Sequence, residues 1–270
     1  MPSRAAFILA AISPRAILST LLGAALFDAP MMGPAAAMVG GAPPAASDFT
    51  RHAVLIVGSR GSSCTGVAVA RDLVLTVAHC VLPGPDYKLV DYDAARRPVL
   101  KDVVAITRHP QFKLDTMLAH RATADVALLR LAEPLPAGMA PVPLGVRVSV
   151  NVGERFTVAG FGVTVRGDGR TGGTLRQAGL IATGQPSSLQ LRLVDPDTRN
   201  ERSGLGACTG DSGAPVFEEA GGRLALIGLV SWSTGPKNAA GCGGLTGVTP
   251  LARYRDWIVD TARELGSPLP

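Results

Sequence analysis

A serine stands between glycines in the stretch Cys208-Thr209-Gly210-Asp211-Ser212-Gly213-Ala214-Pro215. Glycine permits the sharp backbone turns of a tight loop, and such a loop can direct backbone N–H groups at a negative charge that develops on a carbonyl oxygen. A serine hydroxyl becomes a good nucleophile only beside a base. An ordinary loop rich in glycine and serine would look the same, so the rest of the sequence must supply a base and an acid.

Two apolar stretches earlier in the chain contain such groups. His79 ends the run Thr76-Val77-Ala78-His79-Cys80, and Asp125 lies at the start of the run 124–131. A carboxylate buried against a histidine fixes the tautomer of the ring and stabilises the imidazolium that forms during proton transfer. Taken singly, a structural histidine and a turn or cap aspartate are the simpler interpretations. His79 and Asp125 indicate a catalytic role only when they are considered together with Ser212.

The composition favours an all-β protein. The 270 residues are 47% hydrophobic, enough to bury a full core, and include 32 glycines and 21 prolines but only 4% aromatic residues. This composition suits many short strands joined by turns better than a helical bundle. Short apolar runs bounded by turn residues predict strands at 53–57, 65–70, 73–77, 103–107, 126–131, 156–159, 175–182, 189–193, 215–218 and 224–232.

Two features suggest how the chain is organised. The segment 133–143 contains four prolines and interrupts the strand pattern, so we expect it to cross between two sub-domains. The segment 250–265 has apolar residues at helical spacing, which predicts a C-terminal helix docked by one face. These apolar residues are Leu251, Tyr254, Ile258, Ala262 and Leu265.

The three stretches together, in the order His, Asp, Ser, resemble the trypsin-like (chymotrypsin-fold) serine peptidase family. The resemblance implies an all-β fold of two packed antiparallel six-stranded β-barrels with a C-terminal α-helix and an active site in the cleft between the barrels. It also implies barrels at about 38–135 and about 136–270. Further matching stretches are Met38-Val39-Gly40-Gly41, Ala159-Gly160-Phe161-Gly162, Val230-Ser231-Trp232 and the terminal helix.

The resemblance assigns catalytic roles by matching position. It implies that His79 acts as general base and then general acid, that Asp125 orients it, and that Ser212 attacks the scissile carbonyl. The N–H groups of Gly210 and Ser212 would form the oxyanion hole. Removal of one such donor typically lowers turnover about 100- to 1000-fold.

Four cysteines in an exported chain suggest two disulfides, with three pairings open from the count alone. Cys64 and Cys80 flank a predicted hairpin that turns at Arg71-Asp72, so a bridge between its ends is geometrically easy. The resemblance implies this pair and a second, Cys208–Cys242. A zinc site is the alternative, but the sequence has no Cys-x-x-Cys motif and no paired histidine spacing.

The resemblance also places the substrate-binding residues. The position six residues before the nucleophile forms the floor of the primary pocket, and aspartate there selects Lys or Arg. This chain has Gly206 followed by Ala207. We therefore expect cleavage after uncharged residues, with Ser231 and Trp232 pairing with and covering the extended substrate backbone.

The walls of the pocket leave an alternative open. Ser233 stands where glycine is usual, and the segment 233–243 looks lengthened, so that either Thr246 or Gly244 could face the pocket. A serine-lined pocket with Lys237 nearby would instead accept glutamate.

Residues 1–37 resemble a secretory signal peptide. Arg4 and Arg15 precede the apolar run 16–27, and small residues follow at 34–37. This order of charge, apolar core and small residues predicts export to the periplasm or the medium, and the apolar run is too short for a membrane anchor.

Cleavage after the last small residue suggests a route to the active form. In the resembling family, a new amino terminus folds inward and its ammonium pairs with the aspartate before the nucleophile. Those residues match Met38 and Asp211, with methionine in place of the usual isoleucine. A cut after Ala37 would therefore yield an active enzyme directly upon export and folding.

The charge pattern and the motifs limit the function classes. The formal net charge of +5 comes from scattered arginines rather than from a basic stripe, which argues against nucleic acid binding. We expect protein or peptide substrates, possible protein inhibitors, no cofactor and no metal. A lipase or esterase would place its histidine and acid after the serine, so the order excludes one. A catalytically inactive homologue that acts as a binding module remains the alternative.

Overall fold

Two closed β-barrels form the core of the protein in a computed structural model that describes residues 38–93, 95, 97–119 and 121–270. The expected signal peptide at 1–37 lies outside the described residues. Each barrel has six strands, and all neighbouring strands are antiparallel. Both barrels belong to one compact unit of the chain, which contains all the described residues. The predicted fold class, including the C-terminal helix, is confirmed.

The first barrel is built from the first half of the described chain. Its strands follow the order β1-β2-β3-β6-β5-β4 around the barrel. Residue Ala70 pairs with Leu73, which places the β2–β3 turn at Arg71-Asp72 as the sequence predicts. The strands are β1 (Ala53–Gly58), β2 (Ser63–Ala70), β3 (Leu73–Thr76), β4 (Tyr87–Tyr92), β5 (Pro98–Arg108) and β6 (Ala127–Leu131).

The second barrel repeats this plan with the order β10-β11-β12-β9-β8-β7. Its interior is filled by apolar side chains that include Phe156, Leu180, Leu191 and Ile227. The strands are β7 (Arg155–Gly160), β8 (Arg176–Ser187), β9 (Gln190–Val194), β10 (Pro215–Ala220), β11 (Arg223–Ser233) and β12 (Thr246–Pro250).

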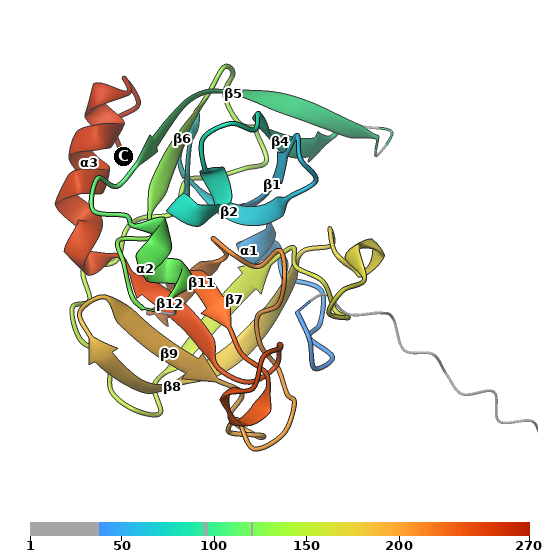
Figure 1. Cartoon of the computed structure of the whole chain (residues 1–270). Helices are drawn as coiled ribbons and strands as arrows, with labels where there is room; N and C mark the ends of the chain where they lie inside the picture. Colours follow the sequence, from blue (N-terminus) through green and yellow to red (C-terminus); the bar gives the residue numbers. More distant parts are fainter. Residues whose placement is uncertain (1–37, 94, 96, 120) are drawn as a thin grey trace, which may run out of the picture. The chain divides into compact units, whose positions relative to one another are not determined.

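Helices are short in the described residues. α1 (Ser47–Thr50) and α2 (Leu114–Leu118) are single turns, whereas α3 (Arg255–Glu264) is the C-terminal helix. Figure 1 shows α3 beside β6, and α3 buries Ile258 and Ala262. The 3₁₀ turns are η1 (Ala78–Val81), η2 (Gly169–Thr171), η3 (Pro236–Asn238) and η4 (Ala252–Tyr254).

One predicted boundary needs correction, and two strands were missed. The C-terminal helix begins at Arg255, because Pro250 ends β12 and 252–254 forms the turn η4. The strands β4 and β12 were not predicted from the sequence. Charged residues break the apolar pattern of β4, and β12 contains a glycine and ends at a proline.

Residues at the start of the described chain pack against the second barrel. Val39 forms a β-bridge with Gly206, and the side chain of Met38 is buried in the core of the second barrel. Phe49, in α1 before the first barrel, contacts Phe217 of β10 in the second barrel, with their rings 5.4 Å apart. Such contacts fix the two barrels against each other and therefore fix the cleft between them.

Candidate active site

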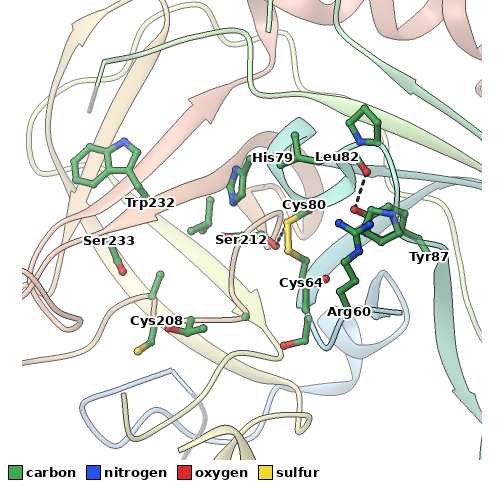
Figure 2. Close-up of a pocket in the computed structure, with 18 residues that line it drawn as sticks. Arg60, Cys64, His79, Cys80, Leu82, Tyr87, Cys208, Ser212, Trp232 and Ser233 are labelled. Carbon is green, nitrogen blue, oxygen red and sulfur yellow. Dashed lines mark hydrogen bonds between the residues drawn. A yellow bond between two sulfur atoms is a disulfide. The ribbon is translucent and has the colours of Figure 1, made fainter. Parts of the chain in front are cut away.

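A cavity of about 580 Å³ lies between the barrels and contains the predicted catalytic residues His79 and Ser212. Figure 2 shows Trp232 and Ser233 on one side of these two residues and Tyr87 on the other. The first barrel contributes Tyr87, and the second contributes Trp232 and Ser233. The site therefore exists only where the two barrels meet.

Strand pairing brings His79 and Asp125 together. His79 lies in η1 directly after β3, and Asp125 precedes β6, which pairs with β3. The distance between His79 Nδ1 and Asp125 Oδ2 is 2.7 Å, and the His79 backbone N–H donates to Asp125 Oδ1 at 3.0 Å. Two contacts to one carboxylate fix both the backbone and the ring of the histidine.

Asp125 is 1% exposed and accepts a further hydrogen bond. Ser231 donates its hydroxyl to Asp125 Oδ2 at 2.6 Å. Burial raises the pKa of Asp125, but the charge of His79 and hydrogen bonds from His79 and Ser231 lower it, so that the pKa lies below its ordinary value. Asp125 is therefore held as a carboxylate. The sequence suggested Ser231 only as a partner of the substrate backbone, and its contact with Asp125 was missed.

Close packing forces glycine into the loop that carries Ser212. Gly213 has a φ of +82°, and a Cβ atom there would lie 2.1 Å from the carbonyl oxygen of Thr65. Gly210 has a φ of +95°, and a Cβ atom there would lie 2.9 Å from Gly162 Cα. A side chain at either position would strain the backbone and displace its neighbours.

Hydrogen bonds hold the peptide groups of this loop. The Asp211 N–H donates to the Cys208 carbonyl at 3.0 Å, the Gly213 N–H to the Val230 carbonyl at 2.7 Å, and the Ala214 N–H to the Asp211 carbonyl at 2.9 Å.

Two N–H groups of the same loop remain available. Within the described residues, neither the Gly210 N–H nor the Ser212 N–H donates a hydrogen bond to the protein. Both residues line the cavity. In the same part of the chain, no hydrogen bond joins the Ser212 hydroxyl to His79, although catalytic contacts often tighten only when a substrate binds.

Two disulfides brace the cavity. Cys64–Cys80 connects β2 to η1, the turn that carries His79. Cys208–Cys242 connects the loop before Ser212 to the segment that precedes β12. These are the two pairs that the resemblance implies.

The predicted specificity residues do not all reach the cavity. Ala207, Trp232 and Ser233 line it, whereas Gly206 is buried beside it and does not. Ser231 lines a second cavity, of about 460 Å³, that shares the Trp232 wall.

The sequence left open whether Thr246 or Gly244 faces the specificity pocket, and the structure shows the surroundings of both. Thr246 is fully buried and accepts a hydrogen bond from the Ala207 N–H at 3.1 Å, whereas Gly244 packs against the backbone of Gly235. Lys237 Nζ lies 3.9 Å from Glu201 Oε2 on the surface and is not among the residues that line the cavity.

Met38 and Asp211 are both fully buried. The Asp211 carboxylate accepts hydrogen bonds from the N–H groups of Gly162 and Cys208, at 2.8 and 2.9 Å. Among the described residues, Asp211 makes no hydrogen bond to Met38 and no ion pair with a basic side chain. Burial raises the pKa of Asp211 to about 7, against the lowering effect of the two hydrogen bonds.

Comparison with protein families gives a match along most of the described chain. The family model described as Trypsin matches residues 38–258. The chain belongs to the trypsin family.

Other members of the trypsin family are moderately similar in sequence. Vitamin K-dependent protein C of Mus musculus is 28% identical over 82% of this chain and 51% of its own length. Transmembrane protease serine 9 of Rattus norvegicus is 30% identical over 62% of this chain and 16% of its own length. CLIP domain-containing serine protease B4 of Anopheles gambiae is 25% identical over 83% of this chain and 69% of its own length. The chain thus spans about half of the first of these trypsin-family relatives, and far less of the second.

Neither a cluster of metal ligands nor a membrane-spanning helix occurs among the described residues of this trypsin-family chain. No three His, Cys, Asp or Glu side chains gather there as metal ligands would. None of the helices described is both long enough and apolar enough to cross a bilayer.

Proposed function

We propose that this protein is an exported serine endopeptidase in which Ser212, His79 and Asp125 form the catalytic triad. The observation that carries the proposal is the 2.7 Å contact between the buried Asp125 and Nδ1 of His79, which lines the same cavity as Ser212. Proton transfer from a serine to a histidine held by a carboxylate is an established way to make a serine nucleophilic.

The proposed reaction has two stages. In the first, His79 Nε2 takes the proton of the Ser212 hydroxyl while Oγ forms a bond to the scissile carbonyl carbon. The negative charge on the carbonyl oxygen is stabilised by the N–H groups of Gly210 and Ser212. His79 then gives its proton to the amine that leaves, and an acyl-enzyme remains. In the second stage, water takes the place of the amine and the same groups act in reverse order.

We propose that cleavage follows uncharged residues. Ala207 and Ser233 line the cavity without contributing charge, and no acidic residue is among those that line it. The substrate backbone would extend the sheet at the end of β11, beside Ser231 and Trp232. Acidic specificity through Lys237 is the less favoured alternative, since its ammonium lies near Glu201 on the surface.

We propose that a cut after Ala37 activates the protein. The new ammonium of Met38 would pair with Asp211, whose buried carboxylate has two hydrogen-bond donors and a raised pKa. Met38 also has a φ of +53°, which costs a residue other than glycine about 1–2 kcal/mol. An amino-terminal residue has no preceding peptide and is released from this restriction.

The organisation of the chain completes the proposal. We assign residues 1–37 to a signal peptide and 38–270 to the peptidase domain, with barrels at about 38–135 and about 136–270. Two disulfides fit an oxidising compartment, the periplasm or the medium. Protein or peptide substrates, and protein inhibitors that occupy the same cleft, are the expected partners.

The test is cleavage-site profiling of a diverse peptide library with protein that begins at Met38, beside Ser212→Ala. We expect cuts after uncharged residues that disappear with Ser212→Ala. Cuts after Lys or Arg would keep the mechanism and overturn the pocket assignment. If neither protein cuts any peptide, the chain is instead an inactive homologue that acts as a binding module.

A further inference from the structure

The hydroxyl of Thr65 reaches from the first barrel to the loop that carries Ser212. Thr65 lies on β2 and is fully buried. Its Oγ1 donates to the Gly210 carbonyl oxygen at 2.9 Å and accepts from the Phe161 N–H at 3.0 Å. One hydroxyl thus uses its proton and a lone pair to join three segments of the chain.

The first of these bonds fixes the orientation of the Gly210–Asp211 peptide group. Its carbonyl accepts from Thr65, and its N–H donates to the Cys208 carbonyl at 3.0 Å. A peptide group that is bonded at both ends cannot rotate without loss of both bonds. Gly210 lacks a side chain and has a φ of +95°, so its backbone has little other restraint on rotation.

The backbone of Thr65 holds the loop as well. Its N–H donates to the Ser212 carbonyl at 2.8 Å, and its carbonyl oxygen accepts the Thr76 hydroxyl at 2.8 Å. The same carbonyl oxygen faces Gly213 so closely that a Cβ atom there would lie 2.1 Å away. These backbone contacts survive a change of side chain, so the contribution of the hydroxyl can be measured by itself.

We propose that Thr65 is a positioning residue that holds Gly210 in the orientation in which its N–H faces the cavity together with the Ser212 N–H. The inference rests on the proposed function, because it gives these two N–H groups the role of the oxyanion hole. Without the hydroxyl, the Gly210 carbonyl and the Phe161 N–H lose their partner. If the Gly210–Asp211 peptide then rotates to find another, it moves Gly210 Cα and with it the adjoining Thr209–Gly210 peptide, which carries the Gly210 N–H.

The expected effect lies in turnover. Complete loss of one oxyanion donor lowers kcat about 100- to 1000-fold. Without the Thr65 hydroxyl, the Gly210 N–H would still point into the oxyanion hole for part of the time. We therefore expect Thr65→Val to lower kcat about 10- to 100-fold with little change in KM. Thr65→Ser keeps the hydroxyl and should retain kcat within about threefold.

A matched control removes the same kind of bonds elsewhere. Thr171 Oγ1 donates to the Asp168 carbonyl at 2.7 Å and accepts from the N–H groups of Thr164 and Val165, each at 3.2 Å, at the end of η2, which does not line the cavity. Thr171→Val should therefore leave kcat unchanged, even though it loses one donated and two accepted hydrogen bonds, whereas Thr65→Val loses one of each.

A pair of inhibitors separates the oxyanion hole from substrate binding. A peptide aldehyde, built on the best substrate of the library, adds the Ser212 hydroxyl across its carbonyl to form a tetrahedral hemiacetal that uses the hole. The corresponding peptide alcohol has no carbonyl and reports ground-state binding alone. We expect Thr65→Val to weaken the aldehyde by the same factor as kcat and to leave the alcohol unchanged.

The inference is overturned if Thr65→Val keeps wild-type kcat and aldehyde affinity, or if the alcohol weakens as much as the aldehyde. Should Thr65→Val fail to fold, Thr65→Ala is judged by the same criteria, and failure of both to fold would show that Thr65 is only structural. A wild-type protein that neither cuts peptides nor binds the aldehyde would contradict the proposed function itself. The role of Thr65 is tested separately, by comparing the Thr65 variants with an active wild type.

Discussion

Ser231 donates its hydroxyl to the same oxygen of Asp125 that faces the His79 ring, at 2.6 Å. The carboxylate therefore accepts three hydrogen bonds, two from His79 and one from Ser231. Because these bonds favour the ionised form, Asp125 stabilises the fold while it is a carboxylate and loses this contribution once it is protonated.

Replacing Ser231 by alanine should show this dependence on pH. The pKa of Asp125 is depressed in the folded state, so its contribution to stability is present above the unfolded pKa of 3.8 and is lost as the pH falls through the lower folded value. We expect Ser231→Ala to cost about 1.5–3 kcal/mol in urea unfolding at pH 7, and progressively less as the pH falls below 3.8 and through the lower folded pKa. Ser233→Ala, which removes a hydroxyl that donates to a neutral carbonyl, should show no such pH dependence.

Asp211 should destabilise the uncut protein as the pH rises. Burial raises its pKa from 3.8 to about 7, so the folded state holds the proton more tightly than the unfolded chain does. Stability is then fully present below pH 3.8 and falls as the pH rises to about 7, by about 4 kcal/mol for a shift of this size. In the form that begins at Met38, the ammonium would pair with the carboxylate and remove this loss.

Asp211→Asn isolates this group. In the uncut protein, we expect the variant to be more stable than the wild type at pH 8 and similar to it at pH 4, as measured by urea unfolding. In protein that begins at Met38, the same variant should lose stability and activity, because the ammonium would be buried without a partner. Equal pH dependence of wild type and variant in the uncut form would contradict the assignment.

The two disulfides should affect different kinetic constants. Cys208 and Cys242 are 34 residues apart, and loss of such a crosslink costs about 4 kcal/mol in the chain-entropy model. Cys208 follows Ala207 in the cavity wall, so the double variant Cys208→Ala/Cys242→Ala should mainly raise KM. Cys80 follows His79, so Cys64→Ala/Cys80→Ala should mainly lower kcat. The contrast fails if both double variants change the same constant.

The strands were predictable where burial is continuous. Leu73, Val74 and Leu75 are all fully buried, and their run of apolar residues is visible in the sequence. β4 carries Lys88 and Asp91 among its apolar residues, so its pattern could not be recognised. Side-chain hydrogen bonds across the barrels were even less accessible, since they depend on how two distant segments pack.

In the candidate site, too, contacts between distant segments could not be predicted from the sequence. The three residues proposed as the triad could be picked out because each stands in a distinctive local sequence. Ser231 and Asp125 are 106 residues apart, and Thr65 and Gly210 are 145 residues apart, and in each pair the bond is made by a hydroxyl that the local sequence does not mark as special. Such contacts come from the closure of the two barrels on each other.

Gly206 offers the sharpest test of substrate preference. A Cβ atom at this position would lie 3.3 Å from Gly243 Cα and 3.4 Å from Thr246 Oγ1, distances that small shifts can accommodate. Gly206→Asp would therefore place a carboxylate beside Thr246, next to the cavity wall formed by Ala207. A basic substrate side chain would gain a charge-assisted hydrogen bond there, so we expect the ratio of kcat/KM for Arg over an apolar residue to rise about 10- to 100-fold.

Gly206→Asn provides the matched control, because asparagine has the same size as aspartate and no charge. If the preference comes from charge, only the aspartate variant will cleave after Arg, and its advantage will shrink as salt is added. If both variants change the preference equally, the effect is one of shape. If neither does, Gly206 does not face the substrate, and the preference for uncharged residues must come from Ala207 and Ser233, whose side of the cavity carries no acidic group.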